Sequence, residues 1–205
     1  MSGTKFAAIA TISNKKESSS TLPLWLAEVY DKEENIFFFN DRVSFSFCPK
    51  EVADVLGISD TNGINYEDLV KTNLKIPPKV PESVFELRRK LGLENIKVLK
   101  ALDYRKTISD MPVEEEKDQY LFKQLMCYYI LENFLMCGNN EKSPRAKTWK
   151  LVADLDVFDS VDWAGAAHQH LMNSFSELKK DLDEDKDKEQ QHKFMGCTPI
   201  LEVIF

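Results

Sequence analysis

Glycine and histidine are scarce in this chain, which has seven glycines and three histidines among 205 residues. Loops that hold phosphate need glycine where the backbone approaches the ligand, and no G-x-G-x-x-G, G-x-x-x-x-G-K-[ST] or G-x-S-x-G motif occurs. The H-E-x-x-H motif of zinc proteases is missing as well. The sequence therefore predicts a protein without catalytic residues, without a cofactor and without a metal site.

Cysteine is sparse and widely spaced: Cys48, Cys127, Cys137 and Cys197 form no C-x-x-C pair. This spacing suits neither a zinc knuckle nor the disulfide framework of a small secreted domain. We expect reduced cysteines that fill the core of an intracellular protein.

Long hydrophobic runs are missing too. The longest apolar-rich stretch, residues 120–137, is interrupted by Lys123, Gln124, Glu132 and Asn133. A membrane span needs about 20 predominantly apolar residues, so this stretch is predicted to be a buried helix. The apolar run near the N-terminus is too short for a signal peptide, and we expect neither secretion nor a membrane partner.

Positive charge is in deficit, because 27 Lys and Arg face 34 Asp and Glu and the net charge is −7. That balance argues against a protein whose main task is to grip nucleic acid. Residues 71–106 nevertheless carry ten basic side chains against four acids. A solvated face is the first interpretation, and a weak DNA- or RNA-binding patch is the alternative, formed by Arg88, Arg89, Lys90, Lys97 and Lys100.

Residues 36–47 show the clearest strand pattern. Apolar residues flank Asn40-Asp41, and Val43, Phe45 and Phe47 alternate with polar residues. The pattern predicts a β-hairpin that turns at Asn40-Asp41 and has one buried face. Helical patterns dominate elsewhere, so the expected fold class is mainly α, a helical domain with a small N-terminal β-hairpin.

Two short helices are predicted beside the hairpin. Residues 23–30 form one or two turns packed through Trp25, and residues 49–56 form a helix that Gly57 ends. Residues 49–59 also resemble the first half of a helix-turn-helix motif. The segment that would supply its recognition helix is acidic before Lys71, which disfavours DNA readout.

The rest of the chain is predicted as a series of helices. They cover residues 83–93, residues 95–104, a central helix over 113–138, a helix from Ser143-Pro144 toward Phe158, and a helix with Asp162 as N-cap that continues to Leu178. Residues 1–21 are expected to be a flexible lead and residues 22–205 a single domain. An acidic, mobile loop is expected at about residues 180–192.

Two of the histidines, His168 and His170, invite a metal-site interpretation. On a helix they lie about 200° apart, whereas helical ligands of one metal are three or four residues apart. We expect one to pack beside the core and the other to be exposed. A cysteine hydrolase using Cys197 and His192 is a further alternative, although no oxyanion element is recognisable near them.

Three blocks of sequence resemble a known family, the plant mobile domain, also called aminotransferase-like. They are "LPLWLAEVYDKEENIFFFNDRVSFSFCPKEVADVLGI", "LFKQLMCYYILENFLMCG" with the following "SPRAKTWKLVADLDVFDSVDWAGAAHQHLMNSF", and "FMGCTPILEVIF". The resemblance covers roughly residues 22–205. It extends to the transposon-derived domain of unknown function that precedes Ulp-type proteases in plants.

The resemblance implies a mostly helical, transposon-derived plant domain, linked in some members to nuclear gene silencing and genome maintenance. It implies no catalytic residues, and the chain shows no lysine in a pyridoxal phosphate setting. The implied role is therefore a nuclear or nucleo-cytoplasmic regulatory module that binds protein partners.

The matching positions suit structural roles. Trp25 and Trp163 are expected to fill the core, Gly57 to form a left-handed cap, and Asp162 to cap a helix. The full set of motif positions is Trp25, Tyr30, Asp31, Val52, Leu56, Gly57, Leu155, Asp156, Asp162, Trp163, Gly196 and Cys197.

Overall fold

The computed structural model describes residues 21–58, 63–72, 88–93, 101–136, 144–184, 194 and 196–204, with the backbone alone for residues 101–105 and 144–147. In these ranges the chain is mainly helical, with one small antiparallel sheet near the N-terminus. The predicted fold class is confirmed. None of the helices in these ranges is long and apolar enough to span a bilayer.

The N-terminal part contains α1 (Thr21–Val29) and three strands, β1 (Tyr30–Asp31), β2 (Ile36–Asn40) and β3 (Val43–Phe45), in the order β1-β2-β3. The chain reverses between β2 and β3 at Asp41-Arg42, one residue later than predicted. The strand β1 was not predicted, because two residues are too few for a periodic pattern. Its Asp31 side chain accepts hydrogen bonds from the backbone of the next turn, at Glu33 and Glu34.

Helix α2 (Pro49–Leu56) has the predicted bounds, because both of its ends carry strong local signals. The Glu51 carboxylate accepts a hydrogen bond from the backbone N–H of the N-cap, Cys48, at 2.8 Å. Gly57 ends the helix in the left-handed conformation, with φ of 63°. Cys48 itself is exposed, so the prediction that it fills the core is wrong.

The remaining described elements are helical: α3 (Tyr66–Thr72), α5 (Ala101–Asp110), α6 (Glu116–Ile130), the π-helix η2 (Leu131–Leu135), α7 (Pro144–Val152), α8 (Leu155–Ser160), α9 (Trp163–Asp183) and α10 (Thr198–Ile204). The predicted central helix corresponds to α6 and η2, and its last residues lie outside the described ranges. The predicted helix over 95–104 corresponds in part to α5, which continues to Asp110.

Two boundaries in the second half differ from the predictions. The helix expected to run toward Phe158 is broken into α7 and α8, because the Asp154 side chain caps a new helix by accepting from the backbone N–H groups of Asp156 and Val157. Helix α9 continues to Asp183, so the beginning of the expected loop at 180–192 is helical rather than mobile. Side-chain pairs at i, i+4, such as Lys179–Asp183, support these last turns.

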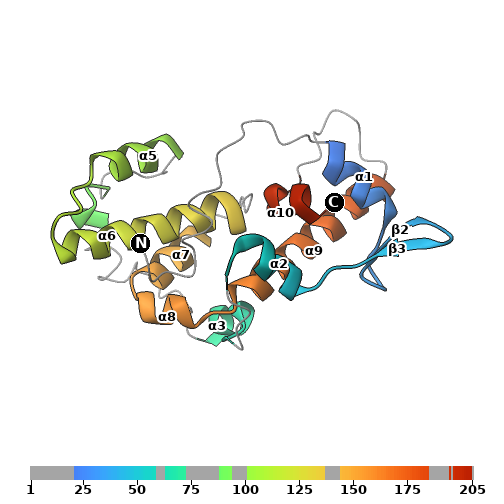
Figure 1. Cartoon of the computed structure of the whole chain (residues 1–205), viewed down its shortest axis with the longest axis horizontal. Coiled ribbons are helices and arrows are strands. Elements are labelled where there is room, and N and C mark those ends of the chain that lie inside the picture. The colour runs from blue at the N-terminus through green and yellow to red at the C-terminus, as the bar shows by residue number, and fades with distance from the viewer. Residues whose placement is uncertain are drawn as a thin grey trace.

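Helix α9 runs through the centre of one group of elements and contacts α1, α2, α3 and β1 (Figure 1). Helix α6 is the centre of the other group and contacts α5, α7 and η2. The hairpin β2–β3 projects at one end of the molecule, and α5 and α6 lie at the other (Figure 1). The buried side chains of both groups belong to one hydrophobic cluster, in which Phe158 and Trp163 pack with ring centroids 4.7 Å apart.

Candidate functional site

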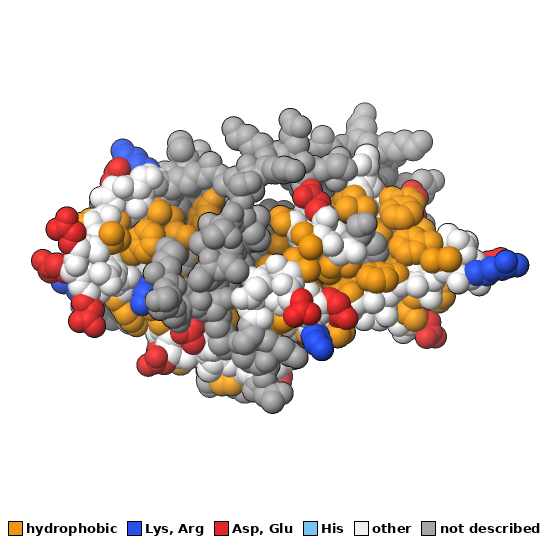
Figure 2. Space-filling view, viewed as in Figure 1, with side chains coloured by type: hydrophobic (Ala, Val, Ile, Leu, Met, Phe, Trp, Pro, Cys, Tyr) orange, Lys and Arg blue, Asp and Glu red, His pale blue; other side chains and the backbone are white. Residues whose placement is uncertain are grey.

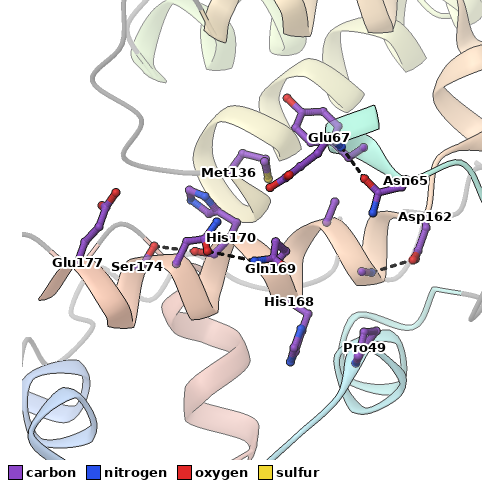
Figure 3. Close-up of a pocket in the computed structure, with 14 residues that line it drawn as sticks. Pro49, Asn65, Glu67, Met136, Asp162, His168, Gln169, His170, Ser174 and Glu177 are labelled. Carbon is purple, nitrogen blue, oxygen red and sulfur yellow. Dashed lines mark hydrogen bonds between the residues drawn. The ribbon is translucent and has the colours of Figure 1, made fainter. Parts of the chain in front are cut away.

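A groove runs along one side of α9 (Figure 3). It forms a cavity of about 480 Å³ that is lined by α9, the start of α3, the first residue of α2, Pro49, and the residue that follows η2, Met136. This volume lies within the range of ligand sites in proteins, roughly 300–1,000 Å³. We refer to this cavity and its lining as the α9 groove.

Helix α9 supplies the floor of the groove. Its N-cap is Asp162, as predicted, and the Asp162 Oδ1 atom accepts a hydrogen bond from the Gly165 N–H at 2.9 Å. The helical repeat then places Gln169, Asn173 and Glu177 along the groove at intervals of four residues. The Gln169 side-chain amide donates to Asn173 Oδ1 at 3.0 Å, which orders this polar stripe.

The start of α3 forms the opposite wall. A parallel bridge holds it against the lead into α9, because the Ile64 N–H donates to the Ser160 carbonyl at 2.9 Å and the Asp162 N–H donates to the Ile64 carbonyl at 3.0 Å. Asn65 caps α3 by accepting from the Glu67 N–H. The Glu67 side chain points toward Met136 across the groove (Figure 3).

The π-helix η2 leads into the far wall. Extra residues of this kind within a helix are often found at functional sites. Its Glu132 accepts a hydrogen bond from Thr148 Oγ1 at 2.9 Å, so this carboxylate is held in place. Burial, with a smaller contribution from the Glu132 charge, raises the pKa of Tyr66, a lining residue, to about 12.

The charge of the lining has one sign. Glu67, Asp162 and Glu177 contribute carboxylates, and no lysine or arginine is found among the described residues that line the cavity. Glu67 also lies 3.4 Å from Lys71 Nζ, but both side chains are mostly exposed, and such a pair contributes little. The described residues contain no cluster of His, Cys, Asp and Glu able to hold a metal ion. The groove therefore presents acceptors suited to a ligand that carries donors and positive charge.

The two neighbouring histidines point to opposite sides of α9, as the helical period predicts (Figure 3). His168 Nε2 lies 2.9 Å from the Phe47 carbonyl oxygen, and its ring packs edge-on against Phe47. Burial lowers the pKa of His168, although the hydrogen bond to Phe47 and the charge of Glu51 act in the other direction. Both histidines are half-buried and belong to the lining of the groove, with His170 on the side of Met136 (Figure 3). They do not form a shared metal site.

A second surface feature lies at the hairpin end. Trp25 is 48% exposed and stacks on Phe39 with ring centroids 5.3 Å apart. The prediction that Trp25 fills the core is wrong, because α1 turns Pro23, Leu26 and Ala27 inward instead. Val43 on β3 is 50% exposed. Hydrophobic side chains gather over this end in Figure 2, and we refer to Trp25, Phe39 and Val43 as the hairpin surface.

Most of the other motif positions are structural. Trp163 is 1% exposed and donates its indole N–H to the Phe158 carbonyl at 2.8 Å. Gly196 lies close to its neighbours, since a Cβ there would meet the side-chain ends of Leu171 and Phe194, which would have to shift. Asp31 ends β1 and accepts from the backbone of the turn that follows, and Asp156 lies in the first turn of α8. The buried motif positions are Tyr30, Val52, Leu56, Leu155 and Cys197.

The structure describes only part of the predicted basic patch. The Arg88 guanidinium donates to the Leu93 carbonyl at 3.0 Å and is half-buried. Arg89 and Lys90 are exposed, and Lys97 and Lys100 lie outside the described residues.

The described residues do not support the cysteine hydrolase alternative. Cys197 is 2% exposed, and His192 lies outside the described residues. Cys127 is buried as well, and burial raises the pKa of its thiol to about 12, so it remains protonated at neutral pH.

Comparison with protein families gives one match. The model of a family described as a domain of unknown function, DUF8566, matches residues 2–202. The chain belongs to this family. Searches of curated proteins and of solved structures found no match. The match extends over nearly the whole chain, and the function of the DUF8566 family is unknown.

The α9 groove was not predicted from the sequence. A signal for it was present in the polar residues Gln169, Asn173 and Glu177, which repeat every four residues on a helix that is otherwise mostly buried. The other residues of the lining lie far from α9 in the sequence. Helix α3 precedes α9 by about 100 residues, and the end of η2 precedes it by about 30, so no local pattern links them.

Proposed function

We propose that this chain is a non-enzymatic protein-interaction module that acts as an adaptor or regulator, of the transposon-derived plant type that its sequence resembles. The resemblance to the plant mobile domain supports a nuclear role in gene silencing or genome maintenance. The observation that carries the interaction role is the hairpin surface, where Trp25 is stacked but half-exposed on Phe39.

Such an arrangement is typical of protein contacts. A large aromatic side chain that is already stacked loses little conformational entropy on binding, and tryptophan is enriched among the residues that dominate binding energy. Val43 extends the apolar area onto an edge strand that projects from the body of the molecule (Figure 1). Exposed apolar patches with polar rims are common at sites of association.

The test uses two matched pairs of substitutions. Trp25→Ser with Val43→Ser removes apolar side chains from the hairpin surface, and Tyr120→Ser with Val113→Ser removes side chains of similar exposure, 47% and 46%, at the other end. We expect the first variant to lose partners recovered from a plant nuclear extract by affinity purification and quantitative mass spectrometry, with affinity reduced about thirtyfold. The second variant should recover them like the wild type. Equal recovery by all three proteins would refute the role of the hairpin surface.

A further inference from the structure

The α9 groove is elongated. Its lining extends along α9 from Asp162 to Glu177, which at 1.5 Å per residue corresponds to about 22 Å. An extended peptide rises about 3.3 Å per residue, so about six or seven residues would match this length. The shape suits a chain segment better than a compact metabolite.

The chemistry of the lining selects among possible segments. The carboxylates of Glu67, Asp162 and Glu177 are distributed along the groove, and carboxamide side chains lie between them. Carboxylates accept hydrogen bonds without donating any, while Lys and Arg side chains donate without accepting, so the two are complementary. Met136 and Ala166 add apolar contacts for the methylene stems of such side chains.

We propose that the α9 groove binds an extended basic segment of a partner protein, with its Lys and Arg side chains paired to Glu67, Asp162 and Glu177. This inference rests on the proposed function in one respect, because it takes the ligand to be part of a protein. The α9 groove and the hairpin surface are different surfaces. The net charge of −7 favours the approach of a cationic partner.

Other occupants fit less well. An acidic peptide or a nucleic-acid strand would place phosphates or carboxylates against the carboxylates of the groove, which disfavours binding. A purely apolar segment would remove the carboxylates of Glu67 and Glu177 from water without replacing their hydrogen bonds. The Glu132 charge acts on Tyr66, a lining residue, and so adds to the negative potential near the groove.

The binding test uses a labelled probe peptide, Gly-Lys-Arg-Gly-Lys-Arg-Gly, and fluorescence anisotropy at low salt. Glu67→Gln with Glu177→Gln removes two exposed carboxylates from the groove while preserving side-chain shape. Glu28→Gln with Glu202→Gln removes two exposed carboxylates elsewhere and changes the net charge by the same amount. We expect the groove variant to bind about tenfold or more weakly, and the control variant to bind like the wild type.

Further probes separate the alternatives. A peptide with acetyl-lysine and citrulline in place of Lys and Arg should not bind, and binding of the basic peptide should weaken as salt rises. Binding of an acidic peptide at equal affinity, no binding of the basic peptide, or equal loss in both carboxylate variants would overturn the proposal. A dimer of the chain that dissociates on Glu67→Gln with Glu177→Gln would assign the groove to a second copy and would also overturn it.

The hairpin variant separates this proposal from the proposed function. Trp25→Ser with Val43→Ser should bind the basic peptide like the wild type, because these residues lie outside the α9 groove. Loss of peptide binding in this variant would contradict the assignment to the groove. Retained peptide binding together with unchanged partner recovery would refute the hairpin role alone.

Discussion

His168 joins α9 to the segment between the sheet and α2 through a single hydrogen bond. Its Nε2 donates to the Phe47 carbonyl at 2.9 Å, so the tautomer with the proton on Nε2 is the one that fits. Because burial disfavours the charged imidazole and lowers the pKa of His168 from 6.5, the folded protein takes up this proton less readily than the unfolded chain.

The resulting pH dependence has a definite sign. Between the ordinary pKa of about 6.5 and the lower folded value, the unfolded state binds more protons, so the free energy of unfolding falls as the pH falls. The slope from one such group is at most about 1.4 kcal/mol per pH unit. Urea unfolding between pH 7.5 and pH 5 measures it.

Substitutions at His168 and His170 test whether His168 causes this pH dependence of the free energy of unfolding. His168→Gln keeps a side-chain donor for the Phe47 carbonyl but does not titrate, so we expect a shallower loss of stability on acidification. His170→Gln, on the opposite side of α9, serves as the control and should retain the wild-type slope. A slope that His168→Gln leaves unchanged would refute the assignment.

Two tryptophans show what residue type alone does not determine. Both Trp25 and Trp163 were predicted to be buried, and the prediction is confirmed for Trp163 only. Trp163 follows the N-cap Asp162 on a helix with a long apolar stripe, so its burial follows from a local pattern. Helix α1 is apolar on most sides, with few polar residues to mark the outer face, so its sequence does not specify which residue remains exposed.

Among the elements, α2 depends most clearly on its ends. Gly57 has φ of 63°, and its N–H donates to the carbonyls of Ala53 and Asp54. A Cβ in this left-handed conformation is strained, so Gly57→Ala should lower the free energy of unfolding by about 1–2 kcal/mol. Asparagine tolerates the conformation better, and Gly57→Asn should therefore be less destabilising. Urea unfolding of the three proteins gives the order, and equal stabilities would contradict it.

Some helix ends with strong local signals were predicted, whereas the cap at Asp154 and the elements held by distant partners were not. Pro49 with Gly57 fixed the bounds of α2, and Asp162 fixed the start of α9. Strand β1 forms only because Tyr30 and Asp31 pair with Phe37 and Ile36. The π-helix at the end of α6 likewise leaves no periodic trace, since its composition continues the apolar pattern of the helix before it.

On the scale of the whole molecule, the fold class followed from periodicity, but the α9 groove did not. The groove depends on the bridge between Ile64 and Val161, which joins segments about 100 residues apart in the sequence. Local patterns carry no information about such a contact. The charge of the groove is nevertheless consistent with the acidic balance of the entire chain.

That balance also leads to a prediction about nucleic acids. The net charge is −7, and the Arg88 guanidinium is engaged with the Leu93 carbonyl, which leaves Arg89 and Lys90 as the exposed basic side chains of that turn. Because phosphate binding requires several clustered cations, we expect no mobility shift of DNA or RNA at about 0.15 M salt. Any weak shift at low salt should disappear in Arg89→Glu with Lys90→Glu if the predicted basic patch causes it. A shift that persists at about 0.15 M salt and is abolished by these substitutions would contradict this expectation. It would show that local attraction between the basic patch and phosphate exceeds the repulsion from the net negative charge of the chain.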